Sequence, residues 1–114
     1  MAEKIIKSVS STNHSYITFV NNHSDEASVL WYNFEGELVK YASIKEGGTY
    51  GVKTFVGHPW TAKDTQTGET LLTGGGKVFY PQSNPTVSEK IYITTPEGRD
   101  YILFLEAVVA VIVW

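Results

Sequence analysis

Short runs of aromatic and β-branched residues recur along the chain, and Gly, Asn, Asp or Pro separates each run from the next. Residues of the first kind favour pleated, half-buried strands, and the separating residues are typical of turns. The 3.6-residue periodicity of an amphipathic helix is hardly visible. The pattern predicts about eight strands, over Tyr16–Asn21, Ser28–Tyr32, Leu38–Ile44, Thr49–Phe55, Trp60–Asp64, Leu71–Leu72 with its flanks, Lys77–Tyr80 and Lys90–Thr95.

The turn residues indicate how these strands follow one another. Gly36 can adopt the positive φ of a tight hairpin, so the strands on either side of it are predicted to be antiparallel neighbours. Gly47, Gly48 and Gly57 predict a continuing meander, and the three glycines at 74–76 predict a loose connection. No segment between strands offers the helix of a βαβ unit. The predicted fold is therefore all-β, a seven- to eight-stranded antiparallel β-sandwich.

The last stretch, Tyr101–Trp114, has a different pattern, because Glu106 is its only charged residue. As a helix it is too short to cross the roughly 30 Å hydrocarbon core of a bilayer, so no membrane span is predicted. We interpret it as an apolar C-terminal segment, a strand or a short helix, that packs on the sandwich. The alternative is a segment that binds a partner or forms a homo-oligomer.

Composition limits the size and class of the protein. The 114 residues are 42% hydrophobic and 18% charged, which predicts one folded domain over residues 1–114. The net charge of −3 and the scattered lysines form no basic stripe, so nucleic acid is not an expected partner. The absence of cysteine excludes disulfides and thiolate metal sites. The first ten residues lack the apolar run of a signal peptide, and a cytoplasmic location is expected.

Catalytic chemistry finds little support in the sequence. None of the three histidines, His14, His23 and His58, has the i, i+4 spacing to another ligand that a zinc-binding helix requires. A Ser-His-Asp triad could be drawn from the composition, but no Gly-x-Ser-x-Gly elbow positions a nucleophile. We therefore expect no catalytic residue, no metal and no cofactor, and do not expect an enzyme.

A set of aromatic and hydroxyl residues remains, namely Trp31, Tyr41, Thr54, His58 and Trp60. Indole and phenol faces can hold the flat apolar ring of a proline, and a 4-hydroxyl on that ring needs a donor and an acceptor nearby. Each residue alone has a simpler interpretation, as core or as a turn residue. The set indicates a binding site only if the fold brings its members together.

Two central blocks resemble a known family. Residues 29–37 read VLWYNFEGE, Tyr41 follows, and residues 55–60 read FVGHPW, with Asp64 beyond them. These blocks resemble the β domain of the von Hippel–Lindau family, which reads VWLNFDGE, has a tyrosine ten residues after its tryptophan, and continues with YRGHLW. The spacings from Trp31 to Trp60 agree without a gap. A looser resemblance extends over about residues 7–96.

The resemblance implies a β-sandwich that binds a hydroxyproline-containing peptide as the recognition half of a ubiquitin ligase adaptor. It implies that Trp31 forms the floor of the pocket and Tyr41 a wall, that Thr54 and His58 share the ligand hydroxyl, and that Trp60 closes the side. Thr54 stands where the family has serine. An unhydroxylated proline would then be rejected.

Departures from the family pattern fall outside these five residues. Lys53 and Phe55 replace a histidine and a tyrosine, and Ser10 and Thr12 replace a peptide-contacting asparagine and arginine. The resemblance therefore implies flanking contacts at these four positions with a different sequence preference. The cysteine-containing elongin box of the family has no counterpart here, so elongin binding is not expected.

Two other functions stay open at this point. The chain could be a structural or self-associating β-sandwich whose pocket is filled and whose apolar tail forms the oligomer. It could also be a carbohydrate-binding module, because sugars stack on tryptophan and pair with His and Thr in a similar way.

Overall fold

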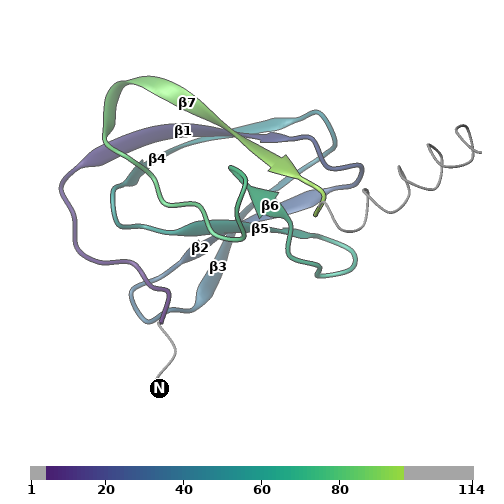
Figure 1. The fold of residues 1–114 in the computed structure, drawn as a ribbon, viewed down its shortest axis with the longest axis horizontal. Helices are drawn as coiled ribbons and strands as arrows, with labels where there is room; N and C mark the ends of the chain where they lie inside the picture. The colour runs from purple at the N-terminus through teal and green to yellow at the C-terminus, as the bar shows by residue number, and fades with distance from the viewer. Residues whose placement is uncertain (1–4, 97–114) are drawn as a thin grey trace, which may run out of the picture.

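The computed structural model describes residues 5–96 (Figure 1). Over this part the chain forms strands and no helix. The strands are β1 (His14–Asn21), β2 (Ala27–Tyr32), β3 (Leu38–Ile44), β4 (Thr49–Phe55), β5 (Trp60–Asp64), β6 (Leu72–Thr73) and β7 (Asn84–Thr94). The apolar stretch 101–114, predicted to be a strand or a short helix, lies outside the described residues, and so does the predicted oligomer contact through it.

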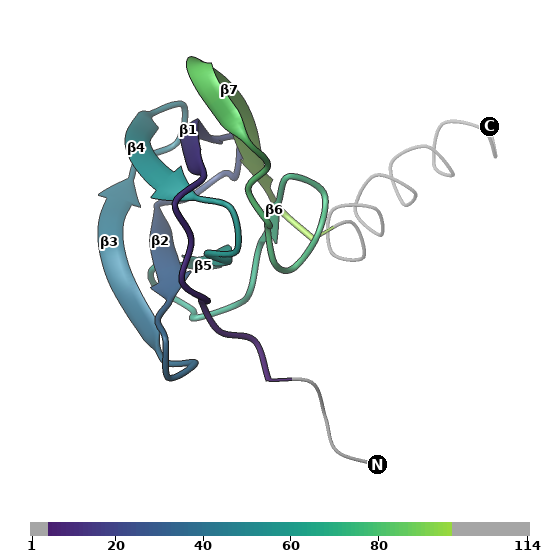
Figure 2. The same ribbon diagram turned by 90° about the vertical axis from the view of Figure 1, so that its left-hand side faces the viewer.

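The strands form two sheets, with the orders β4-β1-β7-β6 and β3-β2-β5. Figure 2 shows them as the two layers of a sandwich-like arrangement. The all-β sandwich predicted from the sequence is confirmed.

The alternation of buried and partly exposed side chains along β1 shows why these residues form a two-layered fold. Ser15, Ile17, Phe19 and Asn21 are buried, whereas the residues between them are partly exposed. A strand points successive side chains to opposite faces, so one face of β1 fills the space between the sheets. The core is completed by Leu71, just before β6, and by residues of both sheets, namely Ala27, Val29, Ile44, Trp60, Ala62, Ile91 and Ile93.

The predicted hairpin at Gly36 is present. Gly36 has a φ of 83°, and the backbone N–H of Asn33 donates to the carbonyl of Glu37 over 2.8 Å. β2 and β3 pair antiparallel on either side of this turn. The bounds predicted for β3, β4 and β5 agree with the structure residue for residue.

The predicted meander is wrong, because the turn after β3 leads into the other sheet. The backbone N–H of Gly47 donates to the carbonyl of Asn21, and Asn21 N–H donates to the carbonyl of Gly48. These bonds tie the turn to the end of β1. β4 therefore pairs with β1 instead of continuing beside β3.

Two further predictions need correction. The predicted strand Lys77–Tyr80 forms only an isolated bridge, in which Phe79 and Trp60 exchange backbone hydrogen bonds of 2.8 and 2.9 Å. The sheets are also not wholly antiparallel, because β7 runs parallel to β1. β7 is not joined to β1 by a hairpin, so nothing in the connection requires the antiparallel direction.

Candidate functional site

The five residues singled out in the sequence line one open cavity of about 330 Å³. They come from every strand of one sheet and from the edge of the other: Trp31 from β2, Tyr41 from β3, Thr54 from β4, His58 from the β4–β5 turn and Trp60 from the start of β5. The cavity thus lies where β4 meets the sheet β3-β2-β5.

The pairing of β2 explains why the two tryptophans share this cavity. Trp31 and Trp60 are direct partners in the antiparallel pair of β2 and β5. Directly opposite residues of such a pair project to the same face. The pairing of β2 with β5 therefore brings together two residues that are 29 positions apart in the sequence.

Tyr41 reaches the cavity because β3 is irregular at this position. Val29 pairs with Ala42 and Leu30 with Lys40, so Tyr41 is an extra residue between two regular pairs. An inserted residue of this kind is a β-bulge, which bends the strand and redirects a side chain. The ring of Tyr41 lies edge-on to both tryptophans, with centroid distances of 6.0 Å to Trp31 and 5.0 Å to Trp60.

Another part of the cavity wall is formed by His58 and its neighbours. The His58 ring lies 5.7 Å from Trp31 and 5.2 Å from Phe55, centroid to centroid. Phe34, at the tip of the β2–β3 hairpin, contacts both Trp31 and His58 edge-on. The wall is thus a set of mutually supporting rings, which limits the freedom of each side chain.

One hydrogen bond fixes the polar part of the cavity. The indole Nε1 of Trp60 donates to Oγ1 of Thr54 over 3.0 Å, and both side chains are buried. The Thr54 oxygen accepts in this bond, so its own O–H remains to be donated elsewhere. The Nε1 of Trp31 is buried and has no hydrogen-bond partner among residues 5–96.

The turn that carries His58 is held by the segment before β1. Gly57 has a φ of 90°, and its carbonyl accepts a hydrogen bond of 3.1 Å from the backbone N–H of Val9. Burial lowers the pKa of His58, while a hydrogen bond to the backbone of Val9 acts in the opposite direction. The net lowering favours a neutral ring at pH 7, with one nitrogen as donor and the other as acceptor.

The predicted flanking residues divide into two pairs. Lys53 and Phe55 line the cavity with the five central residues. Ser10 and Thr12 are exposed on the segment before β1 and do not line it. Sequence reasoning missed two lining residues, Phe34 and Val52. Phe34 stands in a polar hairpin turn, and an aromatic residue there is the signal that could have identified it.

A second polar cluster lies away from the cavity. Nε2 of His23 is 2.7 Å from Oδ2 of Asp64, and Nδ1 of His23 is 2.5 Å from Oγ1 of Thr95. This order of groups resembles a hydrolytic triad, but the His23 side chain is fully buried and unreachable by a substrate. We therefore assign the cluster a structural role, joining β5 to the end of β7.

Asp64 is held ionised by these contacts. Its hydrogen bond with His23, and those from the backbone N–H groups of Thr67 and Gln66, lower its pKa to about 2, against the opposing effect of burial. His23, Asp25 and Asp64 could hold a metal ion by distance alone, since their ligand atoms lie within 4.8 Å of one another. However, His23 and Asp64 already bind each other, so these two side chains satisfy one another without an ion.

Within residues 5–96, no helix has the length and apolar character needed to cross a bilayer. In a comparison with protein families, residues 6–87 match the family model described as VHL beta domain. The match includes all five central residues of the cavity. The looser resemblance noted for residues 88–96 lies beyond it.

Proposed function

Because this chain belongs to the VHL β-domain family, we propose that it is a non-catalytic recognition module whose cavity binds a proline residue within a partner peptide, with preference for 4-hydroxyproline. Membership of the family suggests a substrate-recognition module. The identity of the bound residue is the further step, and it rests on the chemistry of the cavity.

The aromatic walls suit a pyrrolidine ring. Trp31, Tyr41 and Trp60 present ring faces and edges around an open volume of about 330 Å³. A proline ring is apolar and nearly flat, so its C–H groups can contact such surfaces at little conformational cost. The open volume also disfavours the alternative of a pocket filled by its own side chains.

The observation that carries the proposal is that Thr54 and His58 both line the cavity together with the aromatic rings. The Thr54 oxygen already accepts from Trp60, which leaves its O–H to donate to a ligand oxygen. The neutral ring of His58 offers an acceptor nitrogen for the ligand O–H. A 4-hydroxyl group supplies one acceptor and one donor, and so satisfies both residues at once.

Unhydroxylated proline leaves the same two groups unpaired in a buried site. A site built to hydrogen-bond a hydroxyl group can reject the ligand that lacks it by about 10⁴-fold. Hydroxylation of the partner would then switch binding on.

The residues flanking the proline in the partner would lie along β4. Among residues 5–96 this strand is the edge of its sheet and pairs only with β1, and it carries Lys53 and Phe55 at the cavity. The exposed ammonium group of Lys53 favours an acidic residue next to the proline. The flanking preference therefore differs from that of a site with histidine at this position.

Isothermal titration with two peptides tests the proposal. Both carry an acidic residue beside a central imino acid, and they differ only by the 4-hydroxyl group. Binding of the hydroxyproline peptide with at least tenfold higher affinity supports the proposal. Equal weak heats for the two peptides would remove it. Titration with simple monosaccharides in the same buffer tests the carbohydrate alternative.

A further inference from the structure

β7 has one edge that its own sheet leaves largely unpaired. On one side it pairs with β1 from Glu89 to Ile93. On the other side, within the part of the chain that the structure describes, β6 contributes only two residues, which pair with Ile93 and Thr94. One more hydrogen bond, from the N–H of Gly74 to the carbonyl of Tyr92, extends this pairing. After it, the segment that follows β6 turns away from β7.

The turn that ends β6 is built from glycine. Gly74 and Gly75 have φ values of 62° and 90°, and the chain closes on itself through hydrogen bonds between Thr73 and Gly76. A Cβ on Gly74 would lie 2.9 Å from the ring of Phe79. The predicted loose connection is therefore a compact turn, and it removes the chain from the path that a longer β6 would follow.

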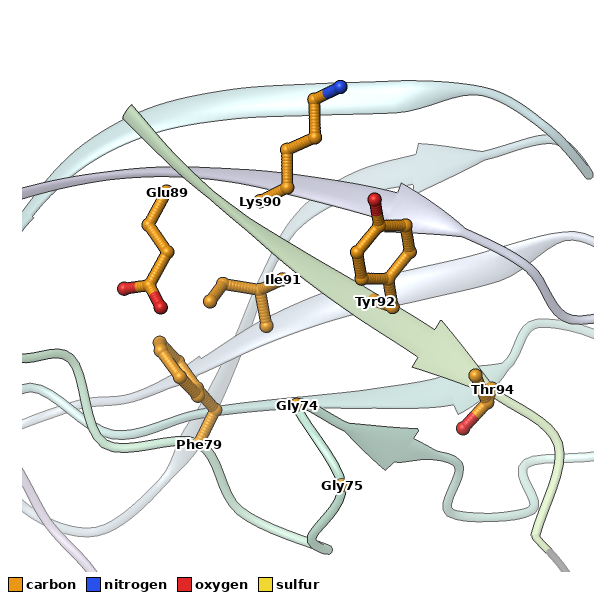
Figure 3. A pocket seen from close by; sticks show the side chains of 8 residues that line it. All are labelled: Gly74, Gly75, Phe79, Glu89, Lys90, Ile91, Tyr92 and Thr94. Carbon is orange, nitrogen blue, oxygen red and sulfur yellow. The ribbon is translucent and has the colours of Figure 1, made fainter. Parts of the chain in front are cut away.

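An open cavity of about 450 Å³ occupies that path. It lies between residues 89–92 of β7, the glycine turn and Phe79 (Figure 3). In Figure 3 the carboxylate of Glu89 extends toward Phe79, and the Lys90 side chain points to the other side of β7. Ile91 is buried and Tyr92 is 46% exposed, so the two faces of this edge differ in character.

The backbone geometry defines how a strand would add here. The register of β6 and β7 pairs Leu72 with Thr94 and Thr73 with Ile93, which places Gly74 opposite Tyr92. Successive residues of a strand point their N–H and C=O groups to alternate sides. Lys90 therefore points both groups to the same side as Tyr92, toward the cavity. An antiparallel strand continuing the path of β6 would form two hydrogen bonds with Lys90.

A second copy of this chain does not suit the edge. Antiparallel pairing of β7 with itself about Lys90 or Glu89 places like charges opposite each other, and pairing about Ser88 or Val87 places both residues opposite uncharged ones. Like charges directly opposite each other destabilise a strand pair. The occupant that the charges favour is a strand of another protein with complementary charges.

We propose that the free edge of β7 binds an extended segment of a partner protein by strand addition. Read from its N-terminus, the segment has an apolar residue opposite Ile91, an acidic residue opposite Lys90 and a basic residue opposite Glu89. Main-chain hydrogen bonds supply affinity in this mode, and alternate side chains supply specificity. This edge faces the β6 side of the sheet and is separated from β4 by β1, so the inference does not depend on the proline pocket.

The test uses the full chain and a synthetic capped peptide of sequence Val-Glu-Lys-Thr-Val-Thr, which begins opposite Ile91 and so leaves the pairing of β6 intact. Binding is followed by NMR amide shifts. The control peptide exchanges its Glu and Lys and keeps the composition. We expect shifts at residues 89–92 and at least tenfold weaker binding of the control peptide, because two cross-strand charge pairs change sign. A third peptide, N-methylated at Glu, should lose binding, because the hydrogen bond to Lys90 is blocked.

A charge-exchanged variant completes the test. In the double variant Glu89→Lys, Lys90→Glu the preference for the two peptides should reverse, and an unchanged spectrum elsewhere shows that the fold is kept. Equal affinity for the two peptides, or shifts confined to other strands, overturns the proposal. Absence of binding to the unmodified chain also overturns it. None of these outcomes bears on hydroxyproline binding.

Discussion

The indole Nε1 of Trp60 donates a hydrogen bond of 3.0 Å to Oγ1 of Thr54, across the gap between the two sheets. The bond makes one residue of the cavity depend on another from a different sheet. It also leaves the O–H of Thr54 available to donate to another group. Thr54 therefore affects both the proposed selectivity for hydroxyproline and the stability of the fold.

Replacing Thr54 by Val should affect both properties. The Trp60 N–H loses its acceptor in a buried site, which costs about 1–3 kcal/mol of unfolding free energy. The preference for hydroxyproline over proline should also fall. Thr54→Ser keeps the hydroxyl and serves as the control, with a preference close to that of the parent chain. Denaturant unfolding and peptide titration measure the two effects. A full preference in the Val variant would contradict the role given to Thr54.

Trp31→Ala should abolish most peptide binding. Trp31 contacts Phe34, Tyr41 and His58, so its removal takes away the surface against which the other rings pack. Loss of a central aromatic anchor weakens binding by about 2 kcal/mol or more, which is roughly thirtyfold. Tyr80→Ala is the matched control, because Tyr80 is 52% exposed and does not line this cavity. If titration finds that the Trp31→Ala and Tyr80→Ala variants bind the peptide with equal affinity, the peptide binds elsewhere.

The preference for hydroxyproline should decline in acid. The pKa of His58 is lowered by burial, so the ring stays neutral at pH 7 and takes up a proton only as the pH falls below its ordinary value of about 6.5. The protonated ring has no acceptor nitrogen left for the ligand hydroxyl. Titrations between pH 7 and pH 5 should therefore show a falling ratio of the two affinities. His58→Phe should give a small ratio throughout this range. A constant ratio in the parent chain would exclude His58 as the acceptor.

Stability should fall at low pH through Asp64. Its pKa of about 2 in the folded chain is below the value of about 3.9 in an unfolded one, so the unfolded state binds the proton first. The contribution is present above about pH 5 and is lost as the pH falls from about 4 toward 2. Asp64→Asn should flatten this part of the stability profile, measured by thermal unfolding. Asp25→Asn changes an exposed neighbour and should keep the slope of the parent chain.

Gly57→Ala should destabilise the turn that carries His58. The φ of 90° disfavours any side chain, and a Cβ would lie 2.8 Å from Cγ2 of Val9. We expect a loss of about 1 kcal/mol or more in unfolding free energy. Gly51→Ala is the control, because its Cβ would meet only Thr18 Oγ1, at an ordinary distance of 3.6 Å. Equal thermal midpoints for the two variants would show that the turn tolerates the change.

Local features of the sequence were sufficient to predict most strands. β3, β4 and β5 are bounded by glycine, proline or polar turns, and their limits follow from these residues. Lys77–Tyr80 has the composition of a strand but forms a single bridge with Trp60, because no neighbouring segment pairs with it over a greater length. Strand formation there depends on a partner that local composition does not specify.

The sequence by itself determined the strand-and-turn pattern, the hairpin at Gly36, the family, and the residue types available for binding. Tertiary structure decided where those residues meet. The crossing from β3 to β4, the parallel entry of β7 and the bulge that redirects Tyr41 depend on contacts between segments far apart in the chain. The burial that keeps His58 neutral has the same origin. Such contacts are fixed by the packing of the whole core, which no local pattern contains.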